Sequence, residues 1–242
     1  QYLADAYEGS CSELEVLLQA AKNFEIDIWK INRKLLVQLL FTGQDVTERM
    51  DLLRDYISAG GSPELEEAFL YRCAYANVIL KQPIHRYMVQ MILRLCRWGA
   101  KVSRLCKIAA LQYYAKNKGM LEEKNRGQVA KIIRELFEEN CLLPVLQQFA
   151  DLVPEVWEIL DKTFVVYEGE PEKQLVLNYR RVEGERAEAQ YHEMELPCVC
   201  DGIYAAGFIL FPGERLQYYI TVSERPEKIL ENGMLLAQEE AA

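Results

Sequence analysis

The residues best suited to chemistry gather near the C-terminal end, where Cys198, Cys200 and Asp201 follow His192. Thiolate, imidazole and carboxylate groups are zinc ligands, and a structural zinc site uses four ligands, usually in two knuckles of Cys-x₂₋₄-Cys type. Here a single residue separates the two cysteines, and the sequence contains no second knuckle. We therefore interpret them as alternating cysteines at the end of a strand, and we expect no metal ion and no cofactor.

Motifs of the common catalytic classes are missing from the sequence. There is no GxxxxGK[ST] phosphate loop, no GxGxxG, no GxSxG elbow and no HExxH. Of the two histidines, His85 stands beside Arg86 at a predicted helix start, where we interpret it as a surface side chain rather than a base. We predict a protein that is not an enzyme. The alternative is an enzyme whose site lies partly in a longer parent chain.

Positive charge is concentrated in the middle of an acidic chain. The formal net charge is −9, yet residues 81–134, which we name the basic belt, hold thirteen basic and two acidic residues, a local balance of +11. The candidate binding residues of the belt are Arg94, Arg97, Trp98, Lys101, Arg104, Lys107, Tyr113 and Tyr114. Arginine and lysine beside aromatic rings can hold a phosphate backbone and stack bases. The same charges can instead pair with acidic segments of this chain or with a protein partner.

A helical period positions the belt. Apolar residues recur every three to four positions as far as residue 162, and Ser10 with Glu13 and Asp45 with Glu48 have capping-box spacing. The main predicted helices cover 28–41, 62–80, 82–98, 101–118 and 122–140, with short segments after Pro144 and Pro154. Hairpin starts near 10, 45, 84 and 121 give a period of roughly 35 to 39 residues, typical of α-helical repeats. We predict a stacked, solenoid-like α-hairpin array over 1–162, with a compact irregular bundle as the alternative.

From Thr163 the apolar period changes to two, which predicts strands. The predicted strands cover 163–167, 174–182, about 189–196, 203–211 and 216–222, and a further strand is expected at 228–236. Five or six antiparallel strands in about 80 residues are typical of an immunoglobulin-like sandwich. The predicted fold class is therefore α+β multidomain, with a helical domain over 1–162 and a small β-sandwich over 163–242.

The segment Asp201–Glu224 predicts a β-hairpin in which Pro212-Gly213 forms a type II turn between two strands. Its first strand, Ile203–Phe211, is apolar on both faces, and such a strand must be covered on both. We expect one face to lie in the β-core and the other against the helices. The two domains would then form one rigid unit.

The same segment resembles a known family. Asp201-Gly202-Ile203, Leu210-Phe211, Gly213-Glu214 and Tyr218-Tyr219-Ile220 are similar to the C-terminal end of very large, uncharacterised bacterial proteins of anaerobic Gram-positive type. That family is defined only as a domain of unknown function, and its order of helices before a small β-domain is also similar. The resemblance implies a bacterial, cytoplasmic, multidomain parent protein. It brings no activity and no catalytic residue.

Cysteine usage and the chain ends suggest a compartment and a role. Seven cysteines at irregular spacings, five of them inside helical patterns, favour a reducing compartment. No apolar run reaches the ~20 residues of a membrane span, and Gln1–Tyr7 lacks the charged start and apolar middle of a signal peptide. We expect a cytoplasmic fragment of a longer protein, without a membrane partner. Its predicted function is a non-catalytic interaction or scaffolding module that binds other domains of its parent chain or a protein partner; the alternative is nucleic-acid binding through the basic belt.

Overall fold

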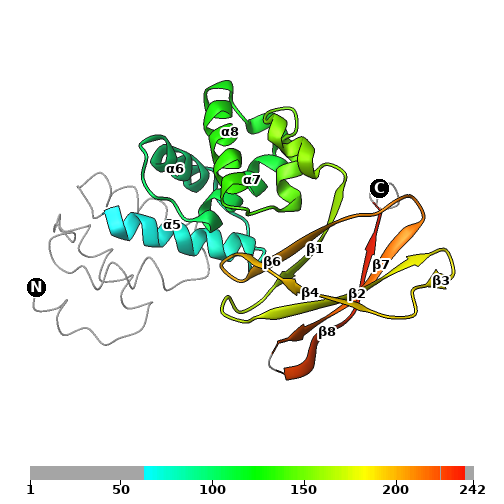
Figure 1. Cartoon of the computed structure of the whole chain (residues 1–242). Helices are drawn as coiled ribbons and strands as arrows, with labels where there is room; N and C mark the ends of the chain where they lie inside the picture. The colour runs from blue at the N-terminus through cyan, green and yellow to red at the C-terminus, as the bar shows by residue number, and fades with distance from the viewer. Residues whose placement is uncertain (1–62, 224, 238–242) are drawn as a thin grey trace, which may run out of the picture. The chain divides into compact units, whose positions relative to one another are not determined.

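The computed structural model describes residues 63–223 and 225–237 (Figure 1). The capping signals at Ser10 and Asp45, and Cys11, lie outside the described residues. The chain divides into two compact units, Gln1–Ala109 and Ala110–Ala242, and each is described by itself. The predicted domain boundary at residue 162 stays a prediction.

The first unit contains α5 (Pro63–Val78), α6 (Arg86–Arg97) and the start of α7 (Arg104–Lys116). Helix α6 begins later than the predicted residue 82, because His85 is its N-cap: its Nδ1 accepts a hydrogen bond from the Tyr87 amide at 3.2 Å. Helices α5 and α6 contact each other, and apolar side chains such as Ala74 and Ile92 are buried.

The helical part of the second unit contains the end of α7, η3 (Lys118–Met120), α8 (Glu123–Glu138), η4 (Pro144–Phe149) and η5 (Pro154–Ile159). The two short predicted segments after Pro144 and Pro154 are 3₁₀ helices. The Gln147 amide Nε2 donates to the carbonyls of Ile159 and Lys162, at 2.6 and 2.8 Å. This side chain therefore fixes the segment that leads from η5 into the first strand.

The rest of the second unit is antiparallel β-structure, which confirms the α+β class. The strands are β1 (Lys162–Glu168), β2 (Leu175–Glu183), β3 (Arg186–Ala187), β4 (His192–Leu196), β5 (Cys198–Cys200), β6 (Ile203–Ile209), β7 (Glu214–Val222) and β8 (Arg225–Leu236). One sheet has the order β1-β6-β5. The other has the order β3-β2-β7-β8, with β4 also paired to β2.

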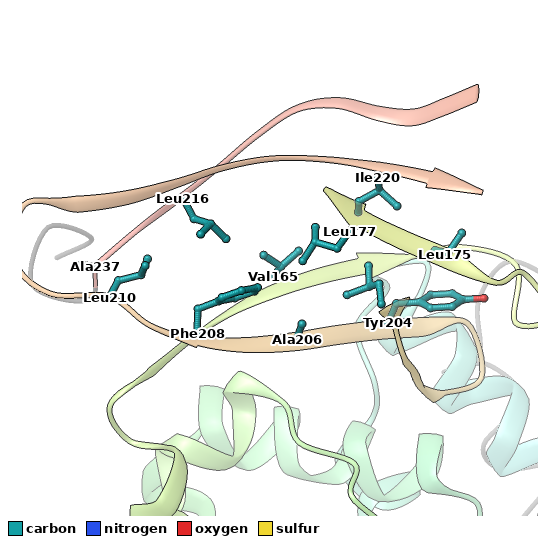
Figure 2. Packing of buried hydrophobic residues seen from close by; sticks show 11 residues of the cluster. Val165, Leu175, Leu177, Tyr204, Ala206, Phe208, Leu210, Leu216, Ile220 and Ala237 are labelled. Carbon is teal, nitrogen blue, oxygen red and sulfur yellow. The ribbon is translucent and has the colours of Figure 1, made fainter. Parts of the chain in front are cut away.

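Both sheets contribute to one apolar core (Figure 2). Val165 of β1 and Phe208 of β6 come from the three-stranded sheet, and Leu177 of β2 and Ile220 of β7 from the five-stranded one. Among the side chains that the structure describes, Tyr204 of β6 is the largest that is fully buried. Its hydroxyl lies 2.6 and 2.8 Å from the carbonyl oxygens of residues 170 and 173 and donates to them, which ties the β1–β2 loop to the core.

The predicted hairpin of Asp201–Glu224 is wrong, because its two strands lie in different sheets. Strand β6 pairs with β1 and β5, whereas β7 pairs with β2 and β8. The turn itself is the predicted one: the Glu214 amide donates to the Phe211 carbonyl at 2.9 Å, and Gly213 has φ 84°. A type II turn splays its flanking strands instead of matching the twist of a pair. The same Pro-Gly turn therefore carries the chain from one sheet to the other.

The second face of β6 is only half covered. Ile203 and Ala205 on that face are buried, as expected, but Ile209 and the following Phe211 are exposed. Coverage on both sides was predicted for the whole strand and holds only for its first half. The expectation that the domains form one rigid unit stays a prediction.

Candidate interaction surfaces

The basic belt reaches the surface around the end of α6. The helix ends in a Schellman motif: the Ala100 amide donates to the Leu95 carbonyl at 3.1 Å, and the Gly99 amide to the Cys96 carbonyl at 3.2 Å. Gly99 has φ 77°, a left-handed conformation that suits glycine. Trp98 is the C-cap residue, and its side chain is 70% exposed. A large apolar ring is thus held out in solvent on a fixed backbone.

One cation lies against this ring. The Arg94 guanidinium lies 5.1 Å from the ring centroid of Trp98, within cation–π range. Arg97, Lys101 and Arg104 are exposed in the same stretch of chain. We name residues 94–104 the Trp98 turn, and five of the eight candidate residues belong to it.

The other three candidates lie further along α7 and are less accessible. Lys107 is only 7% exposed and Tyr114 is buried, and their spacing of seven places them on one helix face. Tyr113 is half-buried, and its hydroxyl donates to the Met120 thioether at 3.3 Å. A partner at the surface would therefore meet the Trp98 turn rather than the whole predicted set.

The C-terminal end of the belt, residues 122–134, is paired within the second unit. The pairs are Lys124 with Glu122 (2.6 Å), Arg126 with Asp151 (3.8 Å), Lys131 with Glu135 (3.7 Å) and Arg134 with Glu155 (3.0 Å). Each cation thus has a carboxylate of its own chain nearby. This arrangement agrees with the internal-pairing alternative for residues 122–134.

The zinc-like residues of the sequence do not converge. Cys198 is exposed, whereas Cys200 is buried with its thiol 3.5 Å from a carboxylate oxygen of Asp201. His192 lies instead 3.4 Å from Glu188. Within residues 63–223 and 225–237, no three or more His, Cys, Asp and Glu side chains are placed to hold a metal ion. None of the six cysteines in these ranges is in a disulfide.

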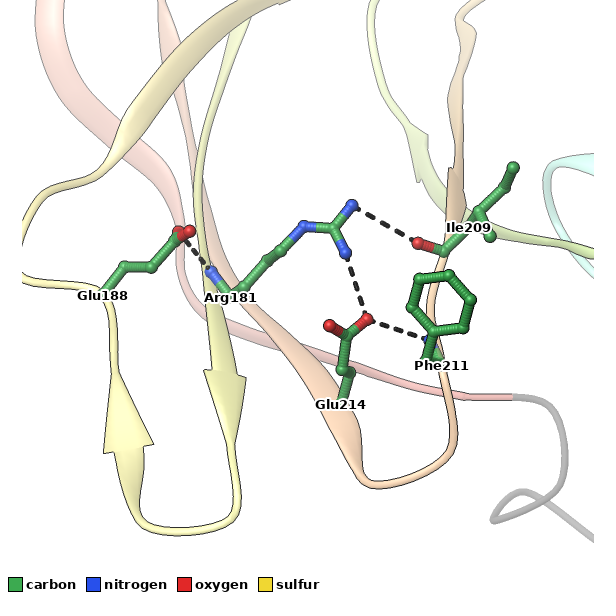
Figure 3. A network of polar contacts seen from close by, with 5 residues as sticks. All are labelled: Arg181, Glu188, Ile209, Phe211 and Glu214. Atoms are coloured by element: carbon green, nitrogen blue, oxygen red, sulfur yellow. Dashed lines mark hydrogen bonds and ion pairs between the residues drawn. The ribbon is translucent and has the colours of Figure 1, made fainter.

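A second exposed apolar site, which sequence reasoning missed, lies at the turn between β6 and β7 (Figure 3). The Glu214 carboxylate accepts from the Phe211 amide at 2.9 Å and from Arg181 Nη1 at 3.0 Å, and Arg181 Nη2 donates to the Ile209 carbonyl at 3.4 Å. The Arg181 amide in turn donates to Glu188 at 2.8 Å. These bonds fix the backbone beneath the Phe211 ring, which is 65% exposed. The only signal in the sequence for these hydrogen bonds was the position of Glu214 directly after Pro-Gly.

None of the helices that the structure describes has the length and apolarity needed to cross a membrane. The comparisons with known proteins give one match. The model of a family of unknown function, DUF5717, described as C-terminal, matches residues 1–242, the whole sequence. No curated protein and no solved structure matches the chain.

Proposed function

We propose that this chain, which belongs to the C-terminal family of unknown function DUF5717, is a non-catalytic protein-interaction module of a larger bacterial protein. In this proposal the helices stack as a hairpin array, the two sheets form an immunoglobulin-like sandwich, and the protein works in the cytoplasm. Its partner is another domain of the parent chain or a separate protein.

The exposed ring of Trp98 is the observation that supports this proposal. Binding energy at protein interfaces concentrates in a few residues, and tryptophan and arginine are enriched among them. At the Trp98 turn, the ring and the Arg94 guanidinium are already in contact. Because the Schellman motif fixes the backbone, little conformational entropy remains to be lost when a partner binds.

A site-specific crosslink tests the proposal. A photoreactive phenylalanine analogue replaces Trp98 in the natural full-length protein, and products formed in cells are identified by mass spectrometry. Trp157 offers a matched control, since its exposure of 69% is nearly equal. We expect a discrete protein adduct or intramolecular crosslink from position 98 only. The same products from both positions, or none from position 98, would refute the proposal.

A second candidate function is polyanion binding at the same turn. It is favoured by the exposed cations Arg97, Lys101 and Arg104, which lie within six residues of Trp98 along the chain, since a tryptophan ring can stack on a base. The test measures the affinity for single-stranded DNA at several salt concentrations. It compares the wild type with a variant in which Arg97, Lys101 and Arg104 are all replaced by Gln. Each lost phosphate contact lowers the salt slope by about 0.7 for a single strand. Equal slopes would exclude this function.

A further inference from the structure

A row of cations and tyrosines crosses the outward face of the five-stranded sheet. Leu177 of β2 and Ile220 of β7 point into the core, so the alternate positions on both strands point outward. The outward set that matters here, which we name the cationic stripe, consists of Arg215, Arg180, Tyr191, Tyr219 and Lys228. Tyr191 directly precedes β4, and the other members lie on β2, β7 and β8.

Four of the five members of the stripe contact one another in series. Arg180 Cζ lies 4.9 Å from the ring centroid of Tyr191. The rings of Tyr191 and Tyr219 meet edge to face at 5.0 Å and 61°, and Lys228 Nζ lies 4.5 Å from the Tyr219 centroid. Asn178, directly across from Tyr219 on the same face, is only 3% exposed, which indicates close packing around the stripe.

The cations of the stripe are held by neutral groups. Arg180 donates through Nε to the Gln217 side-chain oxygen at 3.0 Å and through Nη1 to the residue 188 carbonyl at 3.4 Å. Arg215 Nη2 donates to the residue 184 carbonyl at 2.6 Å. Within the described part of the chain, neither these two guanidiniums nor Lys228 forms an ion pair with a carboxylate. Arg181, which lies between them in sequence, does pair with Glu214.

We propose that the cationic stripe binds a short acidic segment of a protein partner. Positive charges that are oriented by neutral acceptors keep their attraction for an anion, and they are already in place when it arrives. Arg180 is paired with Gln217, two residues beyond Arg215 on β7, so the Cα atoms of the two arginines are diagonal neighbours about 7–8 Å apart. Alternate side chains of an extended strand are separated by about 6.8 Å, since each residue advances by about 3.4 Å. Two carboxylates of an extended segment can thus meet both arginines.

The charge around the stripe favours a short peptide over a nucleic acid. Glu193 and Glu195 are exposed on the outward side of β4, next to the stripe. Residues 163–242 as a whole carry seven basic and fifteen acidic residues, a balance of −8. A long polyanion would be repelled by this surrounding field, whereas a few carboxylates placed on the stripe would not. The tyrosine faces occupied by Arg180 and Lys228 are also not free to stack on bases.

Fluorescence anisotropy of labelled hexaglutamate tests the proposal, with labelled hexaglutamine and a single-stranded oligothymidine as comparison probes. We expect the wild-type protein to bind hexaglutamate alone, with affinity that falls as salt rises. Arg180→Gln and Arg215→Gln should each weaken binding about tenfold, the effect of losing one charge-assisted hydrogen bond. Lys131→Gln, which makes the same change of net charge on α8, should leave the affinity unchanged. Circular dichroism checks that each variant is folded. If one of the two arginine variants is not folded, Lys228→Gln is measured in its place.

Several results would overturn the proposal. The first is that the wild type does not bind hexaglutamate. The second is that Lys131→Gln loses as much hexaglutamate affinity as the arginine variants, which would indicate unspecific attraction. The third is that the oligothymidine binds more tightly than hexaglutamate and loses affinity in the same arginine variants, which would assign the stripe to nucleic acid. The site is separate from the Trp98 turn, so Trp98→Ala should not change the hexaglutamate affinity. Failure at either surface can therefore be told from failure at the other.

Discussion

Replacing Gly202 by alanine should destabilise the β-region much more than the same change at Gly213. Both glycines have φ 84°, so an alanine at either position bears the same left-handed backbone strain. Their surroundings differ. A Cβ atom on Gly202 would lie 2.1 Å from the carbonyl oxygen of Gly169, whereas a Cβ on Gly213 would meet nothing within 4 Å. Gly213→Ala is therefore a control for the backbone strain alone.

The expected magnitudes follow from this geometry. Left-handed backbone costs a residue with a side chain roughly 1–2 kcal/mol, which is the whole effect expected for Gly213→Ala. At Gly202 the Gly169 segment must also move away, because a backbone oxygen cannot remain at that distance. This movement breaks the 2.8 Å hydrogen bond from the Gly169 amide to the Gly202 carbonyl, at about 1 kcal/mol, and strains the loop that Tyr204 holds. We expect about 3 kcal/mol for Gly202→Ala.

Urea unfolding followed by far-ultraviolet circular dichroism measures both variants. The difference between the two midpoints, at an unchanged slope, gives the contribution of the close approach at Gly202. Equal midpoints for Gly202→Ala and Gly213→Ala would refute the reasoning, since they would mean that the Gly169 segment moves at no cost. If Gly202→Ala were as stable as the wild type, the expected cost of the left-handed backbone at residue 202 would be refuted as well.

Three further predictions concern titratable groups. Burial raises the pKa of Tyr204, so stability should fall as pH rises above about 10, where the unfolded tyrosine ionises first; Tyr204→Phe should remove this part of the pH dependence and cost about 1–3 kcal/mol in urea unfolding. Burial raises the pKa of the Cys73 thiol to about 12, so mass spectrometry should find iodoacetamide on exposed Cys198 at neutral pH and on Cys73 only after unfolding. Glu155 has a lowered pKa because of a backbone hydrogen bond and the Arg134 side chain; its stabilising contribution, present at neutral pH, should disappear as pH falls through that pKa, and comparison of acid unfolding with Arg134→Gln should show the loss.

Local structure was largely predictable from the sequence, because it depends on neighbours in the chain. The change of apolar period from 3.6 to two near Thr163 located the start of the β-region, since β1 begins at Lys162. The six predicted strands are present. Strand β3, only two residues long, was not predicted, and the three-residue β5 was expected only as the end of a strand rather than as a strand of its own. Strand pairing was not predictable from apolarity alone. The type II geometry at Gly213 was the available signal against a hairpin, and it carries information about twist rather than about hydrophobicity.

The candidate residues were predicted less well than the helices that carry them. Charge and aromaticity placed Lys107 and Tyr114 in the basic belt, yet both lie on the buried face of α7. The helical period could have separated them, since they are a whole two turns apart and follow the same face as Ala110 and Leu111. At the Trp98 turn the helical period does not predict which side chains are buried, because the helix has ended and the Schellman motif determines the direction of the chain.

The cationic stripe could not be predicted from the sequence, and the reason is physical. Arg180 and Arg181 are adjacent and chemically identical. The pleat of β2 nevertheless directs Arg180 outward and Arg181 to the other side, where it pairs with Glu214 at the β6–β7 turn. A shift of one residue in register would exchange their roles. What selects the observed register is the core, in which Leu177 opposes Ile220. The side chains that meet a partner are therefore chosen by apolar residues that never touch it.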